Sequence, residues 1–189
     1  LIAAMSLASR YNIDGGFIRA WNESVVDVSG WTIIDCMMNI PLLYWASEEI
    51  GDKRFKRIAL RHADMGMRDH VRSDGSVNHI VVHDTERADT VIETNAGQGY
   101  AVGSSWSRGC GWALYGFALS KMTDIDKAEE LASRITLEVY SSLLKADEIV
   151  NVNGYIYRIA CNVFARYIDE RKKSAHLAID SVFLPDNVD

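Results

Sequence analysis

Apolar residues recur at helical spacing over most of this chain, and this periodicity is the feature that most limits the folds open to it. Residues 128–144 show it most clearly, where the apolar side chains stand four apart: Leu131, Ile135, Val139 and Leu143. Such spacing places side chains along one face of a helix. The 189 residues include only two prolines, so few positions interrupt a helix. The pattern therefore favours an all-α domain over a sandwich or barrel of short strands.

The same periodicity predicts about six helices joined by loops. They are expected at residues 1–11, 32–50, 53–70, 108–119, 128–144 and 155–179. Pro41 lies inside the second of these, where it must start a new turn or kink the helix because proline has no N–H to donate. Residues 12–30 are expected to form a loop with a short extended piece at 17–21.

One long segment, residues 72–103, has no helical period. Residues 77–82 alternate enough to predict a short strand, and the rest is expected to be a loop that contains Gly97, Gly99 and Gly103. Loops of this length are uncommon in compact domains and are usually functional where they occur. A functional site is therefore expected here first.

Composition and charge exclude several classes of function. Twenty-six acidic against twenty basic residues give a net charge of −6, which is unsuited to a nucleic-acid partner. The mean hydropathy is −0.06 and no apolar run is long enough for a membrane span, so we expect a soluble protein with no membrane partner. The cysteines, Cys36, Cys110 and Cys161, are odd in number and widely spaced, which favours a reducing compartment such as the cytoplasm. No motif predicts a cofactor or a metal, since His79 and His83 on an extended segment lie too far apart for one ion.

Two groups of residues could carry chemistry. Asp35 lies within the apolar run 33–38; it could be an active carboxyl, or it could form a helix capping box with Thr32. The other group gathers around the glycine-rich loop and consists of Gln98, Tyr100, Trp106, Arg108 and Trp112. These residues could belong to the hydrophobic core and a surface ion pair. They could equally form an aromatic floor and a cationic clamp for an anionic ring.

At these positions the chain resembles a known family. The motifs are WTIIDCMMNIPLLYWAS at 31–47, GQGY at 97–100, SWSRG at 105–109 and WALYGFALS at 112–120. Together they resemble glycoside hydrolase family 88, the unsaturated glucuronyl hydrolases, in the same order and with similar spacing over residues 17–120.

The resemblance implies an (α/α)6 barrel of six helical hairpins, forming a single domain over residues 1–189. The implied partner is an oligosaccharide left by a polysaccharide lyase, whose terminal uronic acid has a C4–C5 double bond. A proton is delivered to C4, water adds at C5, and the hemiketal collapses to release the next sugar, so the usual two-carboxylate scheme of glycosidases does not apply unchanged. A closed ring needs twelve helices, about twice the number expected here, so the chain is expected to hold part of the barrel.

The resemblance also implies roles for single residues. Asp35 matches the general acid and base, and its apolar flank is expected to raise its pKa. The residues that match substrate contacts are His79, Gln98 and Arg108 as polar groups, and Trp21 and Trp112 as aromatic walls. Arg108 and a protonated His79 are expected to attract the anionic substrate in an otherwise acidic protein.

Three departures from the family pattern leave alternatives open. The family's second aspartate lies upstream of Trp21, where this chain has only Asp14 in a turn-like context. The usual acidic pair after Gly-Tyr-Ala is replaced by Val-Gly at 102–103. The motif RGCGW at 108–112 is closer to the sister family 105, the unsaturated rhamnogalacturonyl hydrolases. The alternatives are thus that second activity, or a sugar-binding or vestigial helical domain without catalysis.

Overall fold

The computed structural model describes residues 1–22, 26–104 and 106–182, with side chains placed up to residue 174. The helices of these residues are α1 (Ile2–Ala8), α2 (Pro41–Ile50), α3 (Lys53–Asp69), α4 (Ser107–Lys121), α5 (Ile125–Lys145) and α6 (Val152–Val182), with a 3-10 helix, η1 (Ile34–Met38). The strands are β1 (Tyr11–Asn12), β2 (Phe17–Ile18), β3 (Trp31–Ile33), β4 (Ile80–His83) and β5 (Val91–Asn95). The prediction of about six helices is confirmed.

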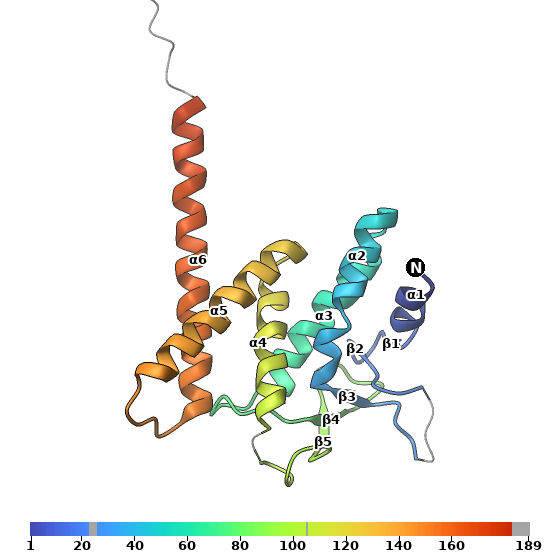
Figure 1. Cartoon of the computed structure of the whole chain (residues 1–189). Coiled ribbons are helices and arrows are strands. Elements are labelled where there is room, and N and C mark those ends of the chain that lie inside the picture. The colour runs from blue at the N-terminus through green and yellow to red at the C-terminus, as the bar shows by residue number, and fades with distance from the viewer. Residues whose placement is uncertain (23–25, 105, 183–189) are drawn as a thin grey trace, which may run out of the picture.

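Helices that follow one another in sequence pack against one another, so α2 to α6 form a row with the strands at one end (Figure 1). Local signals set the helix ends. Asp52 caps α3 by accepting a hydrogen bond from the Arg54 N–H at 2.9 Å, and Asp124 caps α5 by accepting one from the Lys127 N–H at 3.1 Å. Gly51 ends α2 with φ of 70°, a left-handed conformation that favours glycine.

One fully buried set of side chains joins the helices into a common core. It includes Met37 of η1, Tyr44 of α2, Leu119 of α4 and Ile135 of α5. The Tyr44 hydroxyl donates a hydrogen bond to the Leu119 carbonyl at 3.0 Å, which satisfies the polar end of an otherwise apolar ring.

The segment predicted as one helix over residues 32–50 is divided into three elements, so that prediction is wrong over its first part. Residues 31–33 form β3 and residues 34–38 form η1. α2 begins only at Pro41, so the proline lies in the first turn of that helix. The reason is tertiary, because the Thr32 side chain is fully buried and its hydroxyl donates a hydrogen bond to the Val81 carbonyl at 3.1 Å. Strand pairing thus overrides the helical period, and Pro41 starts a new helix as its missing donor requires.

The long segment after α3 contains two strands rather than the one predicted. β4 pairs antiparallel with β3, with Thr32 opposite Val81, and β5 pairs with the other edge of β4. The strand predicted at 77–82 is observed as β4, shifted by a few residues. β5 was not predicted, because three of its five side chains are exposed and its sequence does not alternate between apolar and polar residues. β1 was missed in the same way, as a two-residue strand that pairs with β2.

A buried polar cluster lies beneath this sheet. The Thr32 hydroxyl is 2.9 Å from Nε2 of His70 and 3.0 Å from Nε2 of His83, and His70 Nδ1 is 3.0 Å from the Asn78 carbonyl. All three of these side chains are buried. The cluster links α3 to β3 and β4, and so fixes the sheet against the helices.

Candidate active site

Asp35 occupies η1, directly after β3. The Ile34 N–H donates a hydrogen bond to the His79 carbonyl at 3.1 Å, which places Asp35 next to the start of β4. The capping-box interpretation is wrong, because Ile33 is the N-cap of η1 and no side chain caps that helix. Asp35 is 26% exposed, and its Oδ2 is buried against the His79 ring.

His79 is the residue nearest to that oxygen. Its Nε2 lies 3.1 Å from Asp35 Oδ2, and its Nδ1 accepts a hydrogen bond from the Gln98 N–H at 2.8 Å. The side chain is only 6% exposed. Burial lowers the pKa of His79, and the Asp35 carboxylate partly opposes this. The expectation of a protonated His79 is therefore wrong for neutral pH, because both the desolvation and the occupied Nδ1 favour the neutral ring.

Arg108 supplies the positive charge of this region. Its guanidinium lies over two tryptophan rings, 4.9 Å from the centre of Trp106 and 5.3 Å from that of Trp112. It also donates a hydrogen bond to the side-chain oxygen of Gln98. Trp106 in turn contacts the His79 ring, with 4.3 Å between centroids. These contacts join the glycine loop, the first turn of α4 and the Asp35–His79 pair into one group.

The glycine loop, residues 96–104, is held at two points. His79 holds it at Gln98, and the Arg72 guanidinium donates hydrogen bonds to the Ser104 carbonyl at 3.0 Å and to the Asn78 side chain at 2.6 Å. Arg72 therefore ties the end of the loop to the turn that precedes β4. Ser105, part of one predicted motif, lies outside the described residues.

Four of the five predicted substrate contacts, His79, Gln98, Arg108 and Trp112, gather near Asp35, and Trp21 does not. The Trp21 ring packs edge-on against Trp31 at 6.1 Å, and in the described ranges no hydrogen bond or ring contact joins it to the group. The sequence prediction grouped Trp106 with these residues but gave it no substrate contact, and this ring lies between His79 and Arg108. Its position two residues before Arg108 in the motif was the available signal.

A second carboxylate is not paired with Asp35 in the part of the chain that the structure describes. Asp14 lies in the exposed turn between β1 and β2, where it lines a depression together with Arg61 and Arg68. Within the described residues, no group of three or more histidine, cysteine or acidic side chains is placed to hold a metal ion, and no helix has the length and apolar character needed to cross a membrane.

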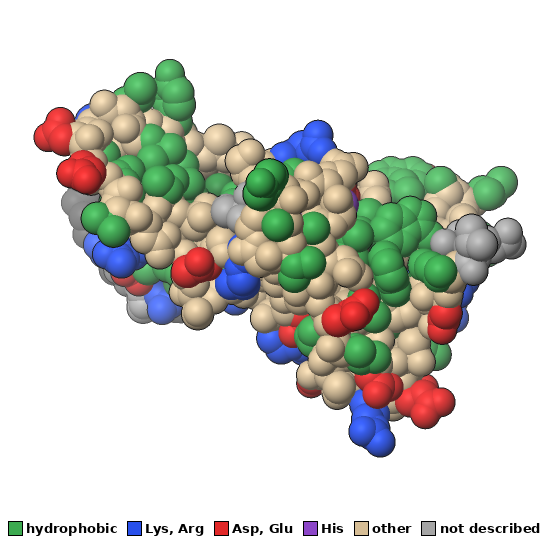
Figure 2. Space-filling view, turned by 90° about the horizontal axis from the view of Figure 1, so that it is seen from below, with side chains coloured by type: hydrophobic (Ala, Val, Ile, Leu, Met, Phe, Trp, Pro, Cys, Tyr) green, Lys and Arg blue, Asp and Glu red, His purple; other side chains and the backbone are tan. Residues whose placement is uncertain are grey.

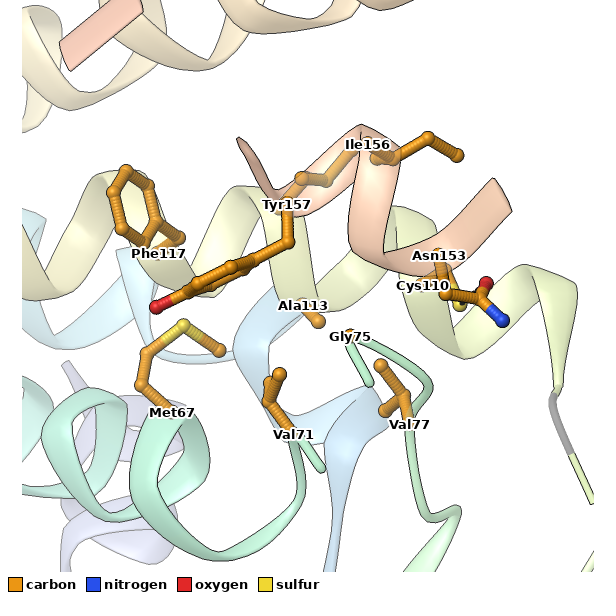
Figure 3. Close-up of a pocket in the computed structure, with 11 residues that line it drawn as sticks. Met67, Val71, Gly75, Val77, Cys110, Ala113, Phe117, Asn153, Ile156 and Tyr157 are labelled. Carbon is orange, nitrogen blue, oxygen red and sulfur yellow. Dashed lines mark hydrogen bonds between the residues drawn. The ribbon is translucent and has the colours of Figure 1, made fainter. Parts of the chain in front are cut away.

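The candidate site lies at the end of the helix row that carries the strands. Figure 2 looks onto that end, where patches of hydrophobic side chains alternate with acidic and basic ones. A separate apolar cavity lies between α3, α4 and α6 and is lined by residues such as Met67, Phe117 and Tyr157 (Figure 3). No predicted site residue lines that cavity, so it is distinct from the group around Asp35.

No family model matches the chain. The unsaturated glucuronyl hydrolase of Bacillus sp. (strain GL1) is 41% identical over 121 residues, which make up 64% of this chain and 32% of that protein. The unsaturated chondroitin disaccharide hydrolase of Streptococcus pyogenes serotype M1 is 40% identical over 120 residues, or 64% of this chain and 30% of that protein. The chain thus spans about a third of the length of the curated relatives that it matches.

The fold is similar to a solved structure as well. The crystal structure of the unsaturated glucuronyl hydrolase from Bacillus sp. GL1, described as responsible for the degradation of glycosaminoglycan, matches with a TM-score of 0.59 and 37% identity. The match covers 72% of this chain and 37% of that one. Those hydrolases have an (α/α)6 barrel fold, so the predicted fold class is confirmed.

Proposed function

We propose, from the premise that this chain belongs with the unsaturated glucuronyl hydrolases, that it carries the proton-transfer site of a hydrolase for unsaturated uronyl oligosaccharides. The substrate class is the set of oligosaccharides that polysaccharide lyases release, in which the terminal uronic acid has a double bond between C4 and C5. Hydration of that bond releases the terminal sugar without direct displacement of the glycosidic oxygen.

The observation that carries the proposal is the state of the Asp35 carboxyl. Its Oδ2 is buried 3.1 Å from His79 Nε2, while the side chain as a whole is 26% exposed. A general acid must be within reach of the group that it protonates, and the exposed part of the carboxyl allows this. Asp35 is proposed to give its proton to C4, after which its carboxylate accepts a proton from the water that adds at C5. The hydrated ring then opens and the next sugar leaves.

Arg108 and the two tryptophans are proposed to bind the uronate. In a chain of net charge −6, an anionic sugar needs a local positive charge, and Arg108 is a guanidinium that lies over Trp106 and acts electrostatically on His79. Its planar group can hold a carboxylate in two parallel hydrogen bonds. Trp106 and Trp112 meet edge to face at 5.1 Å, which leaves ring surface for the apolar side of a sugar. Gln98 is proposed to orient Arg108 through their hydrogen bond.

A sugar-binding domain without catalysis is the second candidate, and the separation of Asp14 from the Asp35 group favours it. Both candidates predict binding of the unsaturated sugar through Arg108. They differ in whether the double bond is consumed.

The test follows the ultraviolet absorbance of the C4–C5 double bond in solutions of this chain. Unsaturated chondroitin disaccharide and unsaturated rhamnogalacturonan disaccharide are assayed separately, which also distinguishes the two substrate classes. Absorbance should fall with the wild-type chain, and Asp35→Asn should abolish the fall. Asp147→Asn, which changes an exposed carboxylate outside the group, is the matched control and should keep the full rate. Calorimetric binding with no loss of absorbance would instead establish the non-catalytic candidate.

For location we propose a reducing compartment such as the cytoplasm, on the odd number and wide spacing of the three cysteines. Thiol labelling of the unfolded, unreduced protein should modify all three. A disulfide found by mass spectrometry in protein taken directly from cells would contradict this.

A further inference from the structure

The two ring nitrogens of His79 have different partners, and this difference fixes the position of its proton. Nδ1 accepts a hydrogen bond from the Gln98 backbone N–H at 2.8 Å, so Nδ1 itself carries no hydrogen. A neutral imidazole has one N–H, which must then be on Nε2. Nε2 is the nitrogen that lies 3.1 Å from Asp35 Oδ2. The backbone of the glycine loop therefore determines that a proton of His79 faces Asp35.

Gly97 makes this contact sterically possible. Its φ is 55°, and a Cβ at this position would lie 1.8 Å from His79 Nδ1. No side chain fits at that distance, so only glycine lets the Gln98 N–H come within hydrogen-bonding range. Gly103 offers a natural comparison, because its φ is 77° in the same loop and a Cβ there would meet nothing within 4 Å. Glycine is therefore required at position 97 by the nearby His79 ring, in addition to the backbone conformation.

We infer that Gly97 is a positioning residue, which lets the Gln98 N–H hold His79 in the neutral form with its proton on Nε2, directed to the Asp35 carboxyl. The inference rests on the proposed function for its consequence in catalysis: once Asp35 has given up its proton, the His79 N–H stabilises the carboxylate that remains. His79 thus acts through Asp35 and needs no charge of its own.

The same contact makes the loop sensitive to acid. Adding a proton to Nδ1 of His79 removes the lone pair that accepts the Gln98 N–H, so the ring can become charged only when this part of the loop moves away. Among the described residues, Asp35 of η1 favours the charged form of the ring and Arg108 of α4 opposes it, and the titratable His70, which follows α3, also interacts electrostatically with His79. The Gln98 side chain also accepts a hydrogen bond from Arg108. Protonation of His79 would therefore also remove the contact that orients Arg108.

The test measures the His79 ring directly, without substrate. Two-bond nitrogen–proton correlation spectra of the full chain, labelled with 15N-histidine, report which ring nitrogen carries the proton, and His79→Gln identifies the His79 signals. Wild type at pH 7.5 should show a neutral ring protonated at Nε2. Gly103→Ala, which adds the same methyl group at a similar φ in open space, should keep that pattern, and so should Gln98→Ala, which retains the backbone N–H. Gly97→Ala should populate the Nδ1-protonated form and raise the pKa of His79.

Two results would overturn the inference. One is a wild-type His79 ring that is charged or protonated at Nδ1 at pH 7.5, a result that does not depend on any variant folding. The other is an equal change of the ring signals in Gly97→Ala and Gly103→Ala. In the absorbance assay, Gly97→Ala should lower kcat/KM roughly 10- to 100-fold below Gly103→Ala, as expected for a misplaced reacting group. If the wild type does not consume the double bond, the proposed function fails, while the spectra still decide the state of His79.

Discussion

Met37 provides a quantitative test of how the site is supported. It lies two residues after Asp35 in η1, is fully buried, and packs between glycines of α3 and α4. A Cβ added at Gly116 would lie 2.7 Å from Met37 Sδ and 2.8 Å from its Cγ, and one at Gly66 would lie 2.0 Å from its Cε. Gly111, in the same helix as Gly116, has nothing within 4 Å of that position. The three helical glycines therefore differ in the space that the structure leaves for an added Cβ.

Replacing a helical glycine by alanine normally stabilises a protein by about 0.5–1 kcal/mol. Gly111→Ala should show this gain. Gly116→Ala should combine it with an overpacking cost of about 1–3 kcal/mol, for a net loss of up to about 2.5 kcal/mol, because the middle of the Met37 side chain cannot move aside in a full core. Gly66→Ala should fall between them, since it meets only the flexible end of the methionine.

The assay is urea unfolding of the chain, followed by circular dichroism, for the three variants with and without Met37→Ala. Met37→Ala alone should cost about 2–5 kcal/mol. In its background Gly116→Ala should become as favourable as Gly111→Ala, which gives a coupling energy of about 1–3 kcal/mol between Met37 and position 116. The reasoning is refuted if Gly116→Ala stabilises the wild-type chain, or if its cost persists after Met37 is removed.

Three further predictions follow from described contacts. Tyr44→Phe leaves the Leu119 carbonyl with one hydrogen bond fewer and should cost about 1 kcal/mol in urea unfolding; an unchanged midpoint would mean that this bond contributes nothing. Arg108→Lys keeps the charge but loses the planar group that stacks on two tryptophans, so binding of the unsaturated disaccharide should weaken roughly tenfold by calorimetry, and equal affinity would argue against a planar contact. Burial lowers the pKa of His62 to about 3 and that of His70 to about 4. Because the unfolded chain binds protons below about pH 6.5 and these folded histidines do not, each should reduce the unfolding free energy by on the order of 2 kcal/mol between pH 7 and pH 5. His62→Asn, whose amide oxygen can accept the Ile18 N–H in place of Nδ1, should flatten that slope, and an unchanged slope would contradict the assignment.

The sequence predicted the helices and much of the site for different reasons. Helical spacing is a local property, so α3, α4 and α5 were predicted within a few residues of their observed ends. The resemblance to the unsaturated glucuronyl hydrolases, read from the motifs, is confirmed by the relatives. It named four substrate-contact residues that the fold gathers near Asp35, although their roles remain predictions.

The errors came from interactions between distant segments. β3 has a helical pattern of apolar residues, and only its pairing with β4 makes it a strand. The charge of His79 depends on the Gln98 N–H and on burial, neither of which a sequence pattern contains. Trp21 was assigned to the site by its motif; its ring packs against Trp31, and its role stays a prediction.

The hydrogen bond from the Ile34 N–H to the His79 carbonyl has a consequence for how such a site can diversify. It joins main-chain atoms, so the sheet sets the separation of the Asp35 and His79 backbones, independently of the side chains of the glycine loop. Side-chain substitutions at residues 98–104 that keep Gly97 and the Gln98 amide should therefore leave that separation unchanged, whatever they do to the rest of the loop.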